Sequence, residues 1–313
     1  MIRKFLDYIA IEKNYSPRTV SEYEADLRAW CDFMGKTTQE FNPKEIDEND
    51  VKAWMIQMLD SKLSPRTVKR RLSAVRSLYK FLLRVELTDV DITQQVITPK
   101  IDKPLPVFFR ENEMKNFKHW HELQSESDIQ DPIKHFEALR DYLIIEMLYQ
   151  TGMRRAEIIA LKDTDVDISL AQIRVFGKRR KERIVPIGEG LIGLIQQYRD
   201  ERADILSGTT GENMFLVQKH KNGLWGAMRT ERLYTIVRIA MGEVSTLKKH
   251  SPHVLRHTFA TTMLNNGADI RTIQSLLGHA SLAATEVYTH TTFEQILKAY
   301  NAAHPRSREN NRI

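Results

Sequence analysis

Hydrophobic residues recur three and four positions apart through most of the chain, a spacing that predicts amphipathic helices. Before residue 97 this pattern is interrupted at Ser16-Pro17, Asn42-Pro43 and Ser64-Pro65. Serine followed by proline favours a helix start, because serine caps free N–H groups and proline suits the first helical position. We therefore predict four or five helices in this region.

The pattern changes after residue 97. Residues 98–106 contain three prolines in nine positions, which is typical of a stiff linker. From residue 107 onward the helical period returns, except at Ala171–Val175 and Glu182–Ile187, which are rich in β-forming residues and indicate a hairpin. The expected fold is mainly α, with a helical domain over 1–97, a linker over 98–106, and a mainly helical domain over 107–313 that includes a small antiparallel β-sheet.

Length and composition narrow the class of protein. A chain of 313 residues favours two domains, each large enough to bury a core. A net charge of +6 and a pI near 9.2 favour a polyanionic partner. The single cysteine, Cys31, excludes an intrachain disulfide and a thiolate zinc site, and no apolar run is long enough to span a membrane. We expect a cytoplasmic protein with no membrane partner.

Residues 61–84 contain eight basic residues and no acidic one. On a helix, six of them share an arc of about 120° opposite the apolar positions. These six are Arg66, Lys69, Arg70, Arg76, Lys80 and Arg84. An ordinary solvated face is the alternative, but such faces normally mix charges of both signs. We predict that this basic face contacts DNA phosphates without reading sequence.

A second set of polar residues surrounds predicted helix starts and ends near the C-terminus. Ser251-Pro252 suits a helix start, which places His253 and Arg256 in a first turn that favours anions. Asp269 should cap a helix that ends before Gly278.

The next residue, His279, should then follow in a loop, and Ser281 should cap a helix that carries Tyr288. Upstream, Gly152 should end an apolar helix that begins near Ala138, and Arg154 or its neighbour should begin the next one.

Two other interpretations of the histidines are open. His253 and His257 are four apart, as in a helical zinc site, but Val254 stands where a zinc protease needs its glutamate. Isolated histidines also commonly fill capping or core positions. The arginines and the tyrosine in the same set favour an anion site over either alternative.

Five motifs, in this order, carry a resemblance to a known family: Thr151-Gly-Met-Arg154, Gly177-Lys178 followed by Lys181–Pro186, His253–His257, Leu276–His279 and Tyr288–His290. The chain resembles the tyrosine site-specific recombinases of the phage integrase family and is most similar to the bacterial Xer type. The resemblance covers nearly the whole chain. Two features depart from it. Arg179 replaces a glycine usual in the hairpin turn, and residues 119–131 are longer and more polar than usual, with no function that we can assign.

The resemblance implies a SAM-like core-binding domain and a catalytic domain that together clamp duplex DNA. It implies an enzyme without metal or other cofactor, in which Tyr288 attacks a backbone phosphate and forms a 3′-phosphotyrosyl intermediate. The other catalytic residues that it implies are Arg154 and Arg256 on the non-bridging oxygens, His253 as general base, His279 as hydrogen-bond donor and Lys178 as general acid.

The resemblance further implies a tetramer on two DNA sites, formed with itself or a paralogous recombinase, a Holliday junction, and a nucleoid-associated role in chromosome-dimer resolution with a DNA-translocase activator. An integrase of a mobile element, a type IB topoisomerase-like enzyme and a silent DNA-binding module are the alternatives. The apolar stripe at Phe293, Ile296, Leu297 and Tyr300 either packs on its own domain or, as the resemblance implies, docks on a neighbouring subunit.

Overall fold

The computed structural model of the protein describes residues 1–101, 106–127, 131–177, 182–206, 214–278 and 290–307. The chain divides into two compact units, Met1–Pro104 and Leu105–Ile313, and each has its own hydrophobic core. The division falls within the proline-rich segment.

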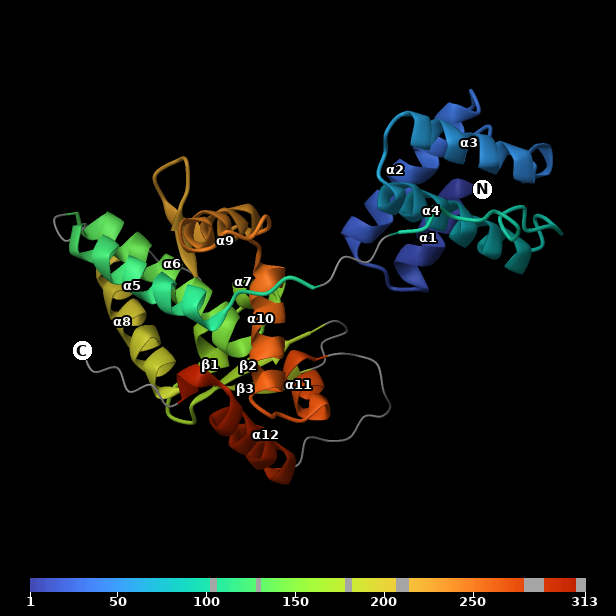
Figure 1. Ribbon diagram of the computed structural model, residues 1–313. Helices are drawn as coiled ribbons and strands as arrows, with labels where there is room; N and C mark the ends of the chain where they lie inside the picture. Colours follow the sequence, from blue (N-terminus) through green and yellow to red (C-terminus); the bar gives the residue numbers. More distant parts are fainter. Residues whose placement is uncertain (102–105, 128–130, 178–181, 207–213, 279–289, 308–313) are drawn as a thin grey trace. The chain divides into compact units, whose positions relative to one another are not determined.

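Unit 1 is helical in its described residues (Figure 1). Its helices are α1 (Ile2–Ile11), α2 (Pro17–Phe33), α3 (Glu48–Asp60) and α4 (Pro65–Arg84), with a 3-10 turn at Pro43–Glu45. The hydroxyls of Ser16 and Ser64 accept hydrogen bonds from the backbone N–H three residues on, at 3.2 Å each, and proline follows each serine. The predicted helix starts and the predicted number of helices are therefore confirmed.

Unit 2 is built around one buried helix. Its helices are α5 (Glu111–Ser127), α6 (Pro132–Thr151), α7 (Arg155–Ile159), α8 (Glu189–Ile205), α9 (Thr230–Val244), α10 (Pro252–Asn265), α11 (Ile270–Leu277) and α12 (His290–Ala303). Every residue of α6 from Leu143 to Thr151 is buried, and α5, α8, α9 and α10 surround the helix. The helix begins earlier than its apolar pattern indicated, because Asp131 caps it and Pro132 fits its first position.

The small antiparallel sheet of unit 2 consists of β1 (Val166–Asp167), β2 (Gln172–Phe176) and β3 (Glu182–Pro186) in that order. Strands β2 and β3 pair with Val175 opposite Arg183, which confirms the predicted hairpin. A second hairpin, β4 (Val217–Lys219) and β5 (Trp225–Ala227), was not predicted, because each of its strands has only three residues.

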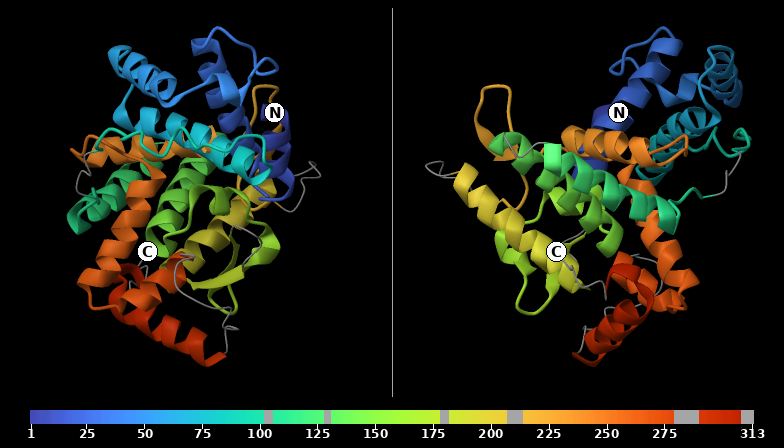
Figure 2. Two further views of the ribbon diagram at one scale, coloured as in Figure 1. Left: turned by 90° about the vertical axis from the view of Figure 1, so that its right-hand side faces the viewer. Right: turned by 60° about the vertical axis from the view of Figure 1, so that its left-hand side comes forward.

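The last helix, α12, packs on its own unit against α10, α11 and β3. It lies at the end of unit 2 opposite α9 (Figures 1 and 2). Ile296 and Tyr300 of the predicted stripe are buried here and Leu297 is half-buried, whereas the side chain of Phe293 lies outside the described residues. Beyond the helix, His304 and Arg306 are also buried.

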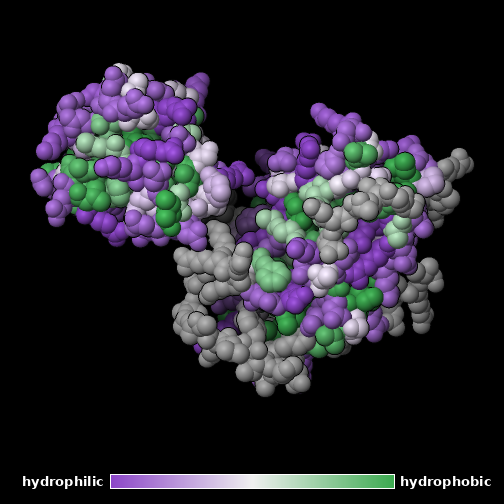
Figure 3. Space-filling model, turned by 180° about the vertical axis from the view of Figure 1, so that it is seen from behind, coloured by the Kyte–Doolittle hydropathy of each residue, from purple (hydrophilic) through white to green (hydrophobic). Residues whose placement is uncertain are grey.

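The surface seen from behind is mainly hydrophilic on both units, with apolar side chains exposed in small patches (Figure 3). Of the helices that the structure describes, none is both long enough and apolar enough to cross a membrane.

Candidate active site

A tight turn at Gly152 brings three helices of unit 2 together. Gly152 ends α6 in the left-handed region, with φ 60°, as its sequence context predicted. A Cβ at this position would lie 2.5 Å from the ring of Phe259 on α10 and 2.8 Å from Leu277 on α11. Only glycine therefore permits this approach. Arg154 follows two residues later as the N-cap residue of α7.

Arg256 is held by backbone carbonyls at this junction. Its side chain is buried, with Nη1 donating to the carbonyl oxygen of Gly152 and Nη2 to that of Leu277, both at 2.6 Å. Burial, together with the positive charges of Arg154 and Arg183, lowers the pKa of Arg256 to about 10. The guanidinium stays charged at neutral pH, and these two carbonyl groups engage two of its five N–H donors.

Glu157 on α7 connects Arg154 to a third arginine. Its carboxylate accepts from the backbone N–H and from Nη1 of Arg154, at 2.8 Å each. The same carboxylate accepts from Nη1 and Nη2 of Arg183, at 3.1 and 2.7 Å. Burial alone would raise the pKa of Glu157, but the hydrogen bonds and charge of Arg183, with the hydrogen bonds of Arg154, lower it overall.

Arg183 on β3 is a site residue that sequence reasoning missed. Its Nε donates to the carbonyl oxygen of Leu276 at 2.7 Å, and the residue is 5 % exposed. One signal was present in the sequence. In a strand, Arg183 must share the inward face with Val185, so a charge there requires a buried partner.

The carboxyl end of α11 receives all three arginines. The carbonyl oxygens of Leu276, Leu277 and Gly278 accept hydrogen bonds from Arg183, Arg256 and Arg154, respectively. Gly278 takes the left-handed conformation predicted for it, with φ 62°. His279 follows directly in the sequence, but His279, Tyr288, Lys178 and the predicted helix start at Ser281 lie outside the described residues.

His253 lies in the first turn of α10, as predicted, and is exposed. Its Nε2 is 3.1 Å from Nε2 of His257. Partial burial lowers the pKa of His253, and the charges of His257, Arg256 and Lys249 lower it further. The imidazole is therefore mostly neutral at neutral pH and can accept a proton.

Two features of this region test the zinc-site interpretation of its histidines and the predicted helix start at Ser251. Within the described ranges, no group of three or more histidine, cysteine, aspartate or glutamate side chains is placed to hold a metal ion. Ser251 occupies the N-cap position of α10, as predicted, but its buried hydroxyl accepts no hydrogen bond from the helix.

The basic face of α4 divides into two sets. Arg70 forms an ion pair with the buried Asp26, Arg76 donates to the carbonyl oxygen of Val96 at 2.6 Å, and Arg84 donates to the hydroxyl of Tyr8. The other set consists of Arg66, Lys69 and Lys80. These three side chains are exposed and form no hydrogen bond or ion pair with the described part of the chain. They can therefore bind phosphates without losing a partner.

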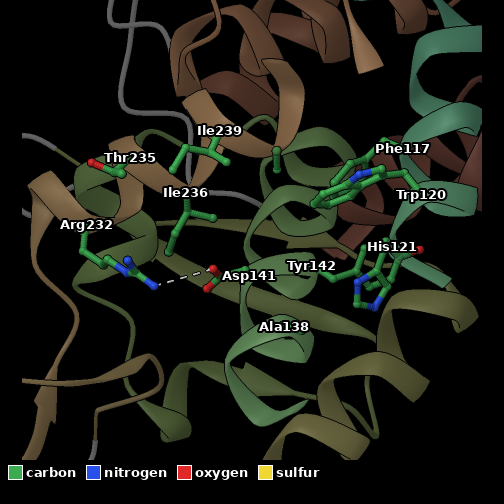
Figure 4. Close-up of a pocket in the computed structure, with 11 residues that line it drawn as sticks. Phe117, Trp120, His121, Ala138, Asp141, Tyr142, Arg232, Thr235, Ile236 and Ile239 are labelled. Atoms are coloured by element: carbon green, nitrogen blue, oxygen red, sulfur yellow. Dashed lines mark ion pairs between the residues drawn. The ribbon is translucent and has the colours of Figure 1, made fainter. Parts of the chain in front are cut away.

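A pocket of about 200 Å³ lies elsewhere in unit 2, between α5, α6 and α9. Figure 4 shows Trp120 and His121 at one side and Arg232 facing Asp141 at the other. The rings of His121 and Tyr142 stack, with their centroids 4.0 Å apart. Burial, together with the charge of His135, lowers the pKa of His121 to about 4. None of the arginines at the end of α11 lines this pocket, which is therefore separate from the candidate active site.

Both units of the chain are similar to known proteins. The sequence model of the phage integrase family matches residues 122–295, and that of the phage integrase N-terminal SAM-like domain matches residues 2–86. The chain is 37% identical to a tyrosine recombinase XerC of Pelotomaculum thermopropionicum, over 98% of both chains. It is 30% identical to a tyrosine recombinase XerD of Oceanobacillus iheyensis, again over 98% of both.

Solved structures are similar in fold. One is the XerH site-specific recombinase bound to difH substrate in a pre-cleavage complex, with a TM-score of 0.63 and 22% identity over 99% of this chain and 85% of that one. Another is the Tn1549 transposon integrase in complex with transposon right-end DNA, with a TM-score of 0.65 and 17% identity over 95% of this chain and 98% of that one.

Proposed function

The chain belongs to the phage integrase family and is a site-specific tyrosine recombinase of Xer type, and from this premise we propose that it cleaves duplex DNA with Tyr288. The observation that carries the proposal is the meeting of Arg154 and Arg256 at the carboxyl end of α11, one residue before His279. One buried and one exposed guanidinium at the same helix end suit the two non-bridging oxygens of a phosphodiester.

Cleavage proceeds by displacement at phosphorus. The phenolic oxygen of Tyr288 forms a bond to phosphorus while the bond from phosphorus to the 5′ oxygen breaks, which leaves a 3′-phosphotyrosyl link. His253 takes the phenolic proton, and Lys178 gives a proton to the departing 5′ oxygen. Arg154 and Arg256 stabilise the charge on the non-bridging oxygens, and His279 donates a further hydrogen bond.

The covalent link conserves the energy of the broken bond, so a 5′ hydroxyl from a second duplex can attack it without a nucleotide cofactor. One reciprocal pair of such strand transfers forms a Holliday junction, and a second pair resolves it, which recombines the two sites. Unit 1 then serves as the core-binding domain that clamps the duplex, with Arg66, Lys69 and Lys80 on its phosphates. The assembly is a tetramer of this chain or of this chain and a paralogous recombinase.

The biological role that we propose is chromosome-dimer resolution in the nucleoid, during cell division and chromosome partition, with a DNA translocase as activator. The XerC and XerD relatives match over almost their whole length, which supports this role over integration of a mobile element. Trapping covalent complexes in cells and sequencing the attached DNA tests it. Adducts at one chromosomal site support the role, and adducts at the ends of a mobile element contradict it.

Tyr288→Phe tests the chemistry. The variant should bind the recombination site with near-normal affinity but form no covalent adduct, because only the nucleophilic oxygen is removed. Adduct formation on a nicked duplex, followed by denaturing electrophoresis and peptide mapping, measures this. An adduct at Tyr149, Tyr234 or Tyr300 would overturn the assignment.

A type IB topoisomerase-like enzyme shares this chemistry but relaxes DNA without exchanging partners. Two differently labelled duplexes separate the two functions. A Holliday junction that joins both labels is expected for a recombinase, whereas relaxation of supercoiled DNA without any joined product would favour the topoisomerase. The silent binding module predicts no covalent adduct with either substrate.

A further inference from the structure

Arg183 is an unusual residue for a strand that packs on a core. It is 5 % exposed, and it stands between the surface-exposed Glu182 and the core residue Val185. Burying an arginine is costly unless its charge is paired and its N–H groups are hydrogen-bonded. Its partners therefore indicate what its placement achieves.

The guanidinium of Arg183 joins three elements. It binds both carboxylate oxygens of Glu157 on α7 and the carbonyl oxygen of Leu276 on α11, while its own backbone belongs to β3. The two-point contact with Glu157 needs the planar fork of arginine, which lysine cannot reproduce.

Both contacts lead to the candidate active site. Glu157 holds the backbone and the guanidinium of Arg154. Leu276 precedes the two carbonyl groups that receive Arg256 and Arg154. Gly278 is shaped around the same group, since a Cβ there would lie 3.1 Å from Nη1 of Arg183.

We propose that Arg183 is a positioning residue for DNA cleavage, which orients Arg154 through Glu157 and fixes the end of α11 that precedes His279. It touches no reacting atom. It links strand β3, which follows Lys178 in the sequence, to Arg154 and Arg256. This inference rests on the proposed function, because it assigns a role within that reaction.

Arg183→Lys tests the proposal, because it keeps the charge and loses the fork. Single-turnover cleavage of a nicked duplex at saturating protein should fall by about 10–10²-fold, since small misplacements of catalytic groups have effects of that order. The dissociation constant for DNA should change by less than about threefold. The matched control is Arg140→Lys on α6, another buried arginine, whose Nε and Nη2 bind Asp141 at 2.9 and 2.7 Å. It should lose stability and keep its cleavage rate.

A double-mutant cycle separates positioning from folding. In a Glu157→Gln background the charge and one of the two acceptor oxygens that hold Arg154 are already lost, so Arg183→Lys should slow cleavage by less than about threefold. The proposal would be overturned if Arg183→Lys slowed cleavage as much in the Glu157→Gln background as in the wild-type background. It would also be overturned if Arg140→Lys slowed cleavage as much as Arg183→Lys does. Wild-type cleavage by Arg183→Lys would overturn it as well.

Replacing both buried partners guards against a variant that fails to fold. Apolar residues often substitute for a buried ion pair without loss of stability. The double variant Glu157→Leu with Arg183→Leu should therefore fold but cleave DNA at least about 10-fold more slowly than the wild type. Rapid cleavage by this folded double variant contradicts the proposal. Absence of any wild-type adduct at Tyr288 would instead contradict the proposed function itself.

Discussion

Arg154 and Arg256 differ in how firmly the protein holds them. The side chain of Arg154 is 44% exposed, whereas Arg256 is 6% exposed and is fixed by two backbone carbonyl groups. Backbone carbonyl groups cannot rotate away as side chains do, so Arg256 is already oriented before DNA binds. Arg154 has one face open for the incoming phosphate.

His253 should determine the acidic limit of cleavage. Its pKa is lowered, so it remains neutral and able to accept the proton of Tyr288 below its ordinary value near 6.5. The cleavage rate should therefore be flat as the pH falls toward about 6.5 and decline only below that value. Single-turnover rates on a nicked duplex across pH 5–9 measure this.

Two variants check the assignment of that limit. His253→Gln should lose the acidic limb and slow cleavage by about 10²–10⁴-fold. His257→Phe removes a charge that lowers the pKa of His253, so its acidic limb should move to higher pH. A limb that persists unchanged in His253→Gln would show that another group titrates.

Single residues differ in how far the sequence predicts them. Gly152 and Gly278 were predictable, because a glycine after an apolar helical run has a local meaning. The pairing of Arg183 with Glu157 joins residues 26 positions apart, and that of Arg70 with Asp26 joins residues 44 apart. Such pairings depend on how elements pack, which local patterns do not encode.

At the scale of elements, the helical period of α4 predicted its basic face but not the division within it. Replacing Arg66, Lys69 and Lys80 with alanine should weaken binding to every duplex. The slope of log affinity against log salt should fall by about 0.9 for each phosphate that the protein no longer neutralises. Binding titrations at several salt concentrations measure this slope, and the unfolding temperature should stay near the wild-type value.

Arg70→Ala is the control within the same face. It leaves Asp26, which is 3% exposed, without its main partner, so it should lower the free energy of unfolding by about 1–3 kcal/mol. If the triple variant keeps the wild-type salt dependence, Arg66, Lys69 and Lys80 belong to an ordinary surface.

The segment after α12 should make unit 2 sensitive to acid. His304 is 3% exposed, and its Nε2 lies 3.3 Å from the carbonyl oxygen of Tyr149. Burial lowers its pKa to about 3. Below the unfolded-state pKa near 6.5, the unfolded chain binds a proton at His304 that the folded chain does not bind. The free energy of unfolding is therefore unaffected by His304 above pH 6.5 and declines as the pH falls from 6.5 toward 3.

Urea unfolding at pH 7 and pH 5 measures this effect. His304→Phe removes the titrating group, so between these two pH values it should lose about 2 kcal/mol less stability than the wild type. His119→Gln, at an exposed position on α5, should behave like the wild type. Equal losses in His304→Phe and the wild type would contradict the role of His304.

For the whole molecule, the fold class and its helical and hairpin elements followed from hydrophobic period and turn residues. The contacts that form the site did not, because α6, α7, β3, α10 and α11 contribute to it from positions far apart in the sequence. The motifs identified Arg154 and Arg256 but not the role of Arg183, and only the fold shows that these three arginines share one helix end.

Cleavage by the complete protein should persist in excess chelator. Arg154 and Arg256 supply the positive charge that a divalent cation would otherwise bring to the phosphate. Adduct formation with and without EDTA measures this, and equal rates are expected. Cleavage that stops in chelator and returns with added magnesium would contradict the mechanism.

The three arginines at the end of α11 have a consequence for the protein before DNA arrives. The aligned peptide dipoles of a helix place roughly half a negative charge at its carboxyl end. Together with Glu157, this partial charge offsets part of the mutual repulsion among Arg154, Arg183 and Arg256. The helix end thus acts as a built-in counter-charge, which lets a phosphate site stay assembled while it is empty.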